Sequence, residues 1–275
     1  MKLKRGQILL ITLLVLTVAT TIALSLIGRA TQDLSISNQL QDSARAFDAA
    51  EAGVESALQS GSGAVNVALG NGVTYTVNVS TIGGSAGVFE AGHKTTAGTA
   101  ETLWLVAHND TTGLIDGTPF YTDPTLTVCW DNPQAALVIG ILYKNSVSGE
   151  YQMARAAVDT NAATHANNFS LPTATSGGCG IAGDLSYQLT FSSFGINNAA
   201  GGTDTLIALR LRPEYADTTV AADGGSLGVP KQGNEISSVG TTTTGVSRKV
   251  LVYQQYRSPA SIFDYVIYSQ SSFGH

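Results

Sequence analysis

The first stretch of this 275-residue chain lacks the residues that interrupt or solvate a helix. Residues 7–27 contain no charge, no proline and no glycine, and proline is absent from Met1 to Leu58. At about 1.5 Å per residue this stretch reaches roughly 31 Å, the thickness of the hydrocarbon core of a bilayer. The sequence therefore predicts one long helix of about 75–80 Å whose first half can span a membrane.

Charged and aromatic residues are also scarce. Only 12% of the residues are charged, 7% are aromatic, and the net charge is −6. An acidic balance gives no general attraction to nucleic acid, and pairs such as Arg210/Arg212 or Arg248/Lys249 are ordinary on strands. Abundant serine and threonine with little charge are typical of an extracellular β-protein.

Motifs for catalysis are missing. There is no phosphate-binding loop, no dinucleotide fingerprint and no acid/base pair, and the four histidines are scattered. Gly224 to Gly228 fits G-x-S-x-G, but Val229-Pro230 follows where a hydrolase needs a helix. Asp217 and Asp223, with Asp204 or Asp184, lack the order of a calcium loop. We therefore expect no enzyme activity, no cofactor and no metal site.

The chain has only two cysteines, Cys129 and Cys179. In an exported chain such a pair indicates one disulfide, worth on the order of 4 kcal/mol for a loop of about 50 residues. Two buried or free thiols are the alternative. Trp130 is expected to point to the opposite face of its strand from Cys129.

Positive charge flanks the apolar run on one side. Lys2, Lys4 and Arg5 precede it, whereas Arg29 is the first positive residue after it. This asymmetry places the N-terminus in the cytoplasm and the rest of the chain outside. A cleaved secretory signal fits poorly, because the run is long and residues 25–28 are a weak cleavage site. An uncleaved single-span anchor remains an alternative.

Two short motifs resemble a known family. Lys4-Arg5-Gly6 before the apolar run resembles the class III signal peptide of type IV pilins, and Ala46-Phe47-Asp48-Ala49-Ala50-Glu51-Ala52-Gly53 resembles the signature of PilX-type minor pilins. The resemblance covers about residues 4–58. It implies storage in the cytoplasmic membrane, cleavage after Gly6 by a prepilin peptidase, and assembly with other pilin subunits through the helix.

The same resemblance implies roles for particular residues. Gln7 becomes the new N-terminus, where this family carries N-methylation, usually on an aromatic residue. The fifth mature residue is Ile11, whereas most major pilins have glutamate there. This difference favours a minor or tip-type subunit of an extracellular filament (fimbrium), and such subunits often serve cell adhesion.

The helix carries two sets of candidate packing residues. Thr17, Thr21 and Ser25 recur every four residues, so their hydroxyls bond either to neighbouring helices or to carbonyls of their own helix. In the second half, a stripe of larger apolar residues is expected to hold the helix against its own β-domain: Leu40, Phe47, Val54 and Leu58. Glu51 and Glu55 lie either on a solvated face or against basic groups of neighbouring subunits.

Beyond the helix, the apolar period changes to two. Short strands separated by glycine, asparagine and serine turns favour an antiparallel sandwich, so the fold class is α+β. The expected strands are Val73–Val79, Thr102–Ala107, Leu126–Trp130, Ala136–Tyr143, Tyr151–Ala157, Tyr187–Phe191, Leu206–Leu211, Glu235–Val239, Ser247–Tyr256 and Phe263–Tyr268. The expected division is a leader 1–6, helix halves 7–28 and 29–60, a linker 61–72 and a β-rich exported domain 73–275.

Two functions follow from these patterns. The first is a structural subunit of a type IV pilus or related filament, with the β-domain facing outward. The second is an uncleaved, membrane-anchored surface protein whose β-domain binds a ligand. Whether Met1 to Gly6 remain attached distinguishes them.

Overall fold

The computed structural model describes residues 5–84, 87–181, 183, 185–198 and 202–260. The chain forms two compact units. The helix unit comprises residues 1–79 and 236–252, and the sandwich unit comprises residues 80–235 and 253–275. Helix in the first unit and antiparallel strands in both give the predicted α+β class.

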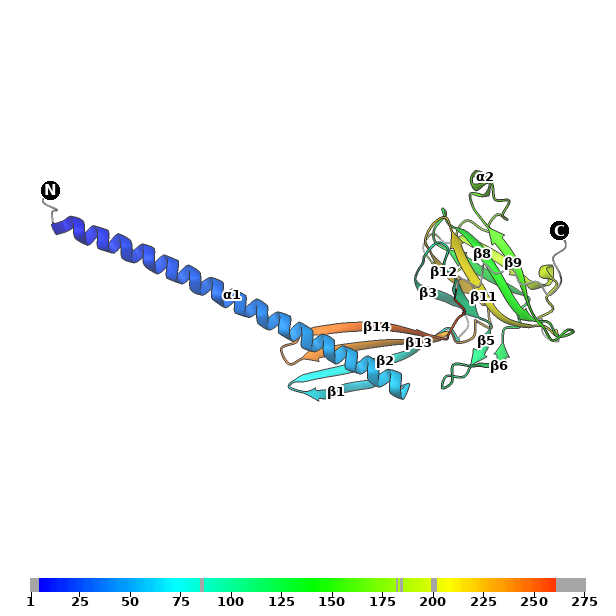
Figure 1. Ribbon diagram of the computed structural model, residues 1–275, viewed down its shortest axis with the longest axis horizontal. Coiled ribbons are helices and arrows are strands. Elements are labelled where there is room, and N and C mark those ends of the chain that lie inside the picture. Colours follow the sequence, from blue (N-terminus) through cyan, green and yellow to red (C-terminus); the bar gives the residue numbers. More distant parts are fainter. Residues whose placement is uncertain (1–4, 85–86, 182, 184, 199–201, 261–275) are drawn as a thin grey trace. The chain divides into compact units, whose positions relative to one another are not determined.

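A single helix dominates the helix unit. Helix α1 runs from Arg5 to Ser60 over 56 residues, without proline or a break at Gly28. Four strands accompany it in the order β1-β2-β13-β14 (Figure 1). Their bounds are Ala64–Gly70 for β1, Val73–Ile82 for β2, Gly233–Thr242 for β13 and Ser247–Gln255 for β14. The structure thus places a strand, β1, within residues 61–72, where the sequence suggested a linker.

Alternation along β2 determines which face of this sheet is apolar. Val73, Tyr75 and Val77 are buried, and the threonines between them are half-buried. The antiparallel β1–β2 pair turns at Asn71 and Gly72, whose φ angles are +51° and +71°. Two positive φ angles are typical of a tight hairpin turn, which an Asn-Gly pair favours. The period-two pattern therefore predicted both this strand and its buried face.

The sheet of the helix unit is completed by residues distant in sequence. Strands β2 and β13 are neighbours in the sheet, although β2 ends at Ile82 and β13 begins at Gly233. The chain leaves the helix unit after Val79 and returns to it at Ile236. Residues 80–235, the larger part of the sandwich unit, are thus inserted between two adjacent strands of the helix unit.

The sandwich unit contains two four-stranded sheets and a small hairpin. One sheet has the order β10-β7-β12-β3, and the other has the order β4-β11-β8-β9. Their bounds are Val88–Thr95 (β3), Glu101–Trp104 (β4), Thr125–Trp130 (β7), Ala136–Lys144 (β8), Tyr151–Val158 (β9), Leu185–Thr190 (β10), Thr205–Glu214 (β11) and Thr218–Asp223 (β12). Strands β5 (Val106–His108) and β6 (Ile115–Phe120) form the hairpin, and the short helices are α2 (Ala162–His165) and η1 (Phe191–Phe194).

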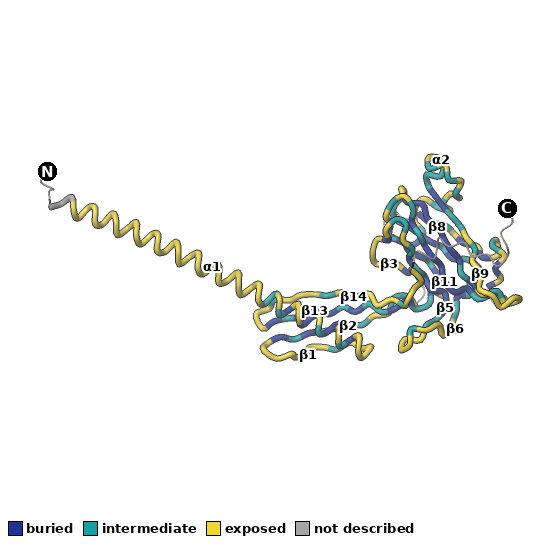
Figure 2. The backbone as a smooth tube through the Cα atoms, viewed as in Figure 1, coloured by how far each residue is buried: buried dark blue, intermediate teal, exposed yellow. Residues whose placement is uncertain are grey.

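Side chains from both sheets form one core. Leu126, Val128 and Trp130 of β7 join Ile139 and Ile141 of β8 in this core, and all five are at most 1% exposed. Figure 2 shows buried positions along β8 and β11 of this unit. Two packed antiparallel sheets agree with the sandwich that the strand pattern predicted. The expected strand Phe263–Tyr268 lies outside the described residues.

The two cysteines form the expected disulfide, which links β7 to the loop before β10. Cys129 and Cys179 are both buried and pack with Ala221, whereas Trp130 lies in the core between the sheets. Cys129 and Trp130 therefore point to opposite faces of β7, as predicted.

Candidate membrane and assembly helix

The first half of α1 presents an uncharged, mostly apolar surface. Every described side chain from Ile8 to Ile27 is exposed, and Leu9 and Leu24 are about 70% exposed. The most apolar window has a mean hydropathy of 2.5 and is not buried at all against the protein (Figure 2). Exposing apolar area to water costs about 25 cal/mol per Å². This half of the helix is therefore suited to lipid or to other apolar helices.

Threonines in this half satisfy their hydroxyls within the helix. The hydroxyl of Thr17 donates to the carbonyl of Leu14 at 2.9 Å, and that of Thr21 donates to the carbonyl of Val18 at 2.8 Å. These bonds reach back three residues, so of the two alternatives for Thr17 and Thr21 the structure shows the intrahelical one. Ser25 is exposed on the same half. A threonine bonded in this way presents only its methyl group to lipid or to a partner.

The second half of α1 packs on the sheet through its smallest residues. The buried positions are Ala46, Ala49, Ala50, Val54 and Ala57, each at most 8% exposed. These positions lie on one helix face, and Ala49, Val54 and Ala57 belong to one apolar cluster with Val73, Tyr75 and Ile236 of the sheet. The alanines and glycine of the sequence motif at residues 46–53 thus form the surface that lets the helix approach the strands closely.

Two glycines make this approach possible. A Cβ atom on Gly53 would lie 2.3 Å from the hydroxyl oxygen of Ser238 and 2.8 Å from the ring of Tyr75. On the opposite side, a Cβ on Gly240 would lie 2.0 Å from the carbonyl oxygen of Ala46. Neither position has room for a side chain unless the helix moves away from the sheet.

The expected packing stripe needs correction. Val54 is buried, but Leu40, Phe47 and Leu58 are 66%, 45% and 46% exposed. The alanine–glycine face meets the sheet because Gly240 lets the helix backbone approach closely, which leaves room for only small side chains between helix and sheet. The larger apolar residues consequently lie on a helix face that the helix unit leaves uncovered.

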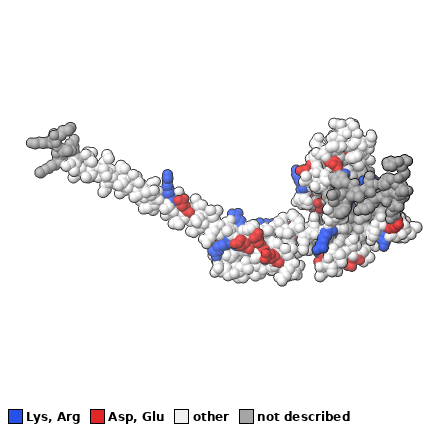
Figure 3. All heavy atoms as spheres, in the orientation of Figure 1, with Lys and Arg blue, Asp and Glu red and all other residues white. Residues whose placement is uncertain are grey.

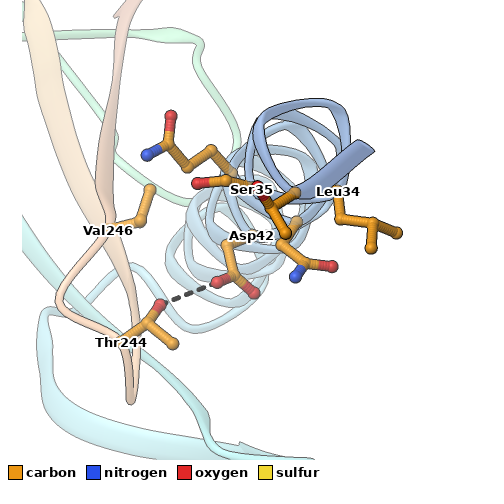
Figure 4. Close-up of a pocket in the computed structure, with 8 residues that line it drawn as sticks. Leu34, Ser35, Asp42, Thr244 and Val246 are labelled. Atoms are coloured by element: carbon orange, nitrogen blue, oxygen red, sulfur yellow. Dashed lines mark hydrogen bonds between the residues drawn. The ribbon is translucent and has the colours of Figure 1, made fainter. Parts of the chain in front are cut away.

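Polar contacts fix the helix where it first meets the sheet. Asp42 accepts a hydrogen bond of 2.8 Å from the hydroxyl of Thr244, which lies in the β13–β14 turn (Figure 4). Ser43 accepts one of 2.8 Å from Nε of Arg248. Arg45 donates to the carbonyl of Asn71 and lies 3.7 Å from Asp42. These contacts hold one level of the helix against both hairpins of the sheet.

A groove lies on the N-terminal side of these contacts. It has a volume of about 500 Å³ and runs between the helix and the β13–β14 turn (Figure 4). Six of the eight residues that line it are polar, and the full set is Thr31, Leu34, Ser35, Asn38, Gln39, Asp42, Thr244 and Val246. The groove thus begins only three residues beyond Gly28, where the lipid-compatible segment ends.

The candidate catalytic and calcium-binding residues of the sequence lie in loops or accept backbone hydrogen bonds in the structure. Ser226 lies in the loop between β12 and β13, with no helix after it. Asp204 accepts backbone hydrogen bonds from Ser146 and Asn197, and Asp217 accepts one from Ala97. Asp184 lies outside the described residues. Among the residues that the structure describes, no group of three or more histidine, cysteine or acidic side chains could hold a metal ion.

One buried acidic residue was not singled out from the sequence. Asp159 is fully buried and accepts hydrogen bonds from the amide of Asn161 at 2.8 Å and the side chain of Asn167 at 2.6 Å. Nδ1 of His165 lies 2.7 Å away. Burial raises the pKa of Asp159, but the hydrogen bonds outweigh it and hold the pKa below its usual value. The carboxylate holds the loop after β9 in place through these contacts. The polar residues Asn161, His165 and Asn167 that follow it closely are the sequence signal that could have indicated its role.

Comparison with known proteins agrees with this geometry. Residues 5–55 match the family model described as PilX N-terminal. No curated protein sequence and no solved structure matches the chain. The matched segment contains the apolar first half of α1 and most of the alanine–glycine face that packs on the sheet. The N-terminal region of this chain is therefore similar to the N-terminal region of PilX-type pilins, which are related to the type IV pilus.

Proposed function

We propose that the chain is a processed subunit of a type IV pilus or a related filament. It is inserted in the cytoplasmic membrane with its N-terminus inside, cleaved after Gly6, and extracted so that its β-structure faces outward. Other pilin subunits and the prepilin peptidase are its partners. The alternative is an uncleaved, membrane-anchored binding protein.

The observation that carries the proposal is that the two halves of α1 differ in burial. Its first half is exposed, uncharged and mostly apolar, whereas residues 46–57 of its second half pack on a sheet of the same chain. Lipid around the first half can be exchanged for neighbouring helices without exposing apolar surface to water. A helix built in this way supports both membrane storage and bundling in a filament.

Two features favour a minor or tip-type subunit. Ile11 replaces the glutamate that the family's major subunits carry, so the lipid-facing half has no carboxylate that requires a partner. The helix unit also carries a large inserted sandwich unit. A subunit with a large insertion is suited to the end of a filament or to sparse positions along it.

The decisive experiment is to shear cells, collect the filament fraction and determine the N-terminal residue of this protein by mass spectrometry. The proposal predicts a mature chain that begins at Gln7 in that fraction. Replacing Gly6 with aspartate should block cleavage, whereas Gly28→Ala should leave it unchanged, because Gly28 lies beyond the leader. A chain that still begins at Met1 and stays with membranes would instead support the anchored binding protein.

A further inference from the structure

We propose that the sandwich unit binds an uncharged carbohydrate at the end where α2 lies, with the ring of Tyr215 as the surface on which a sugar stacks. Tyr215 lies in the loop between β11 and β12. This inference concerns the sandwich unit alone, so it goes beyond the proposed function and holds whether or not the leader is cleaved.

One face of the Tyr215 ring is open to solvent. Tyr215 is 56% exposed, although the imidazole of His165 stacks on its ring with 4.0 Å between the ring centroids and 22° between the ring planes. A tyrosine ring is rigid, with an apolar body and a polar tip. The face of a pyranose carries C–H groups, and its hydroxyls point outward around the rim. An open tyrosine face therefore matches the apolar face of a sugar and leaves the sugar hydroxyls to polar groups around it.

A buried carboxylate fixes this pair of rings. Asp159 is fully buried, lies 2.7 Å from Nδ1 of His165 and accepts a hydrogen bond of 2.6 Å from the side chain of Asn167. The same amide donates to the hydroxyl oxygen of Tyr215 at 3.4 Å. The exposed ring is thus held at its stacked face and at its tip by two groups that share one buried acid. A side chain that is ordered before binding loses little conformational entropy when a ligand arrives.

The backbone that carries the ring is constrained as well. Among the residues that the structure describes, five non-glycine residues have positive φ angles. Three of them lie in these two loops: Ala166 at +50°, Asn168 at +56° and Tyr215 at +70°. For a bulky residue this conformation is unfavourable, and such strain clusters at binding sites. Glycine or asparagine is the ordinary residue for such a turn, so a tyrosine there indicates that the ring itself is needed.

Three loops meet at this end of the sandwich unit. They are residues 131–135, 159–170 and 215–217, which follow β7, β9 and β11. Strands β9 and β11 both end level with the start of β8, which follows the first of these loops. Figure 1 shows α2, which belongs to the second loop, at this end of the unit. In β-sandwiches, loops gathered at one end are a common place for binding sites.

Side-chain amides tie the loops together. Asn132 donates to the carbonyl of Asp217 at 2.8 Å. Asn161 donates to the carbonyl of Pro133 at 2.9 Å. Asn168 is exposed in the same group of loops. An amide side chain both donates and accepts hydrogen bonds, as a sugar hydroxyl does, so this end presents a fixed ring with amide groups in the loops around it.

The charge at this end favours an uncharged ligand. In Figure 3 the atoms at the end of the sandwich unit that carries α2 are mostly uncharged. Asp217 is exposed two residues after Tyr215, and Glu214, directly before it, pairs with Arg212. Bases of nucleic acid also stack on tyrosine, but their phosphates would be repelled by an exposed carboxylate and bind best to a basic groove. A neutral sugar suits both the ring and the charge.

Binding of the full chain to an array of immobilised oligosaccharides tests this assignment. The protein is applied in a sugar-free detergent to uncharged oligosaccharides of hexoses and N-acetylhexosamines, and to sialylated and sulfated oligosaccharides. We expect binding to at least one uncharged oligosaccharide, because display at high density strengthens weak single contacts. Binding to none of them, or to the charged ones alone, would overturn the proposal.

Two substitutions at one position locate the site. Tyr215→Asn removes the ring, and asparagine tolerates a positive φ, so the loop can keep its conformation. This variant should weaken binding by about tenfold or more, and Tyr215→Phe, which keeps the ring, by less than about threefold. Tyr151→Ala removes another tyrosine of the sandwich unit, 66% exposed on β9, and serves as the matched control. Unchanged binding by Tyr215→Asn, or an equal loss in the control, would contradict the assignment.

A measurement on the unaltered chain covers the case in which Tyr215→Asn disturbs the loops. Nitration followed by mass spectrometry reports which exposed tyrosines are accessible. The oligosaccharide that binds on the array, added free in solution, should protect Tyr215 from nitration and leave Tyr151 as reactive as before. Equal nitration of Tyr215 with and without the oligosaccharide would overturn the proposal.

Discussion

At the residue scale, two glycines determine how closely the helix and sheet of the helix unit approach. Gly53 faces Ser238 and Tyr75, and Gly240 faces the backbone of Ala46. We expect Gly240→Ala to destabilise the helix unit more than Gly53→Ala, because Gly240 meets backbone atoms that cannot rotate away. Overpacking of this kind typically costs about 1–3 kcal/mol. A Cβ atom on Gly28 would have no neighbouring atom within 4 Å, so Gly28→Ala serves as the control. Thermal unfolding of the detergent-solubilised chain measures the three variants.

A second prediction at this scale concerns Asp204. Hydrogen bonds from the amides of Asn197 and Ser146 lower the pKa of this buried carboxyl. A depressed folded-state pKa adds stability above the unfolded-state value, near 3.9, and this stability is lost as the pH falls through the folded-state pKa. Asp204→Asn should therefore destabilise the sandwich unit at pH 7 by about 1–3 kcal/mol. The difference in melting temperature between wild type and variant should shrink below about pH 4, and a constant difference would contradict the assignment.

At the element scale, the two sides of the second half of α1 should respond differently to mutation. Leu40→Gln and Phe47→Gln alter exposed side chains, so folding stability in detergent should change by no more than about 0.5 kcal/mol. Val54→Ala removes buried methyl groups and should cost about 1–2 kcal/mol. Urea unfolding of the three variants measures the contrast. Equal losses from all three would mean that the stripe is covered within the chain after all.

Sequence reasoning succeeded where one pattern dominated an element. The apolar run and the absence of proline predicted α1, and strict alternation predicted β2 with Val73, Tyr75 and Val77 on its buried face. Strands β1, β3, β6 and β12 were missing from the expected set. Strand β1 lies between glycine and asparagine turns that suggested a linker. Glycine and charge interrupt β3, Gly117 and Pro119 interrupt β6, and β12 is short and rich in threonine and alanine.

The candidate packing residues were harder to predict, because helical spacing shows which residues share a face but not which face meets the sheet. The larger side chains of Leu40, Phe47 and Leu58 suggested the buried side. The sheet carries Gly240 and Ser238 where the helix crosses it, and these two residues lie almost 200 residues after the helix in the sequence. The buried face of α1 was therefore determined by its packing on β13, a contact between distant segments that helical spacing cannot reveal.

At the scale of the whole molecule, the disulfide and the helix belong to different units. Cys129 and Cys179 lie in the sandwich unit, where the cross-link closes a loop of 50 residues. We expect C129S/C179S to lower the stability of the sandwich unit by about 2–5 kcal/mol and to leave the unfolding of the helix unit unchanged. Circular dichroism at helix wavelengths and tryptophan fluorescence follow the two units separately, since Trp104 and Trp130 are both in the sandwich unit. If the unfolding transitions measured by circular dichroism and by fluorescence shifted down by the same amount, the two units would unfold together.

The insertion also determines the order in which this protein can be completed as it leaves the ribosome. Helix α1 and strands β1 and β2 are made first, but their neighbour β13 follows about 150 residues later. At roughly 5–20 residues per second, that interval lasts about 8–30 seconds. During this time the alanine face of α1 has only half of its sheet, and by the end of it strands β3 to β12 of the sandwich unit have all been made. The helix unit, although it begins the sequence, therefore gains the second half of its sheet only after strands β3 to β12 of the sandwich unit have been made.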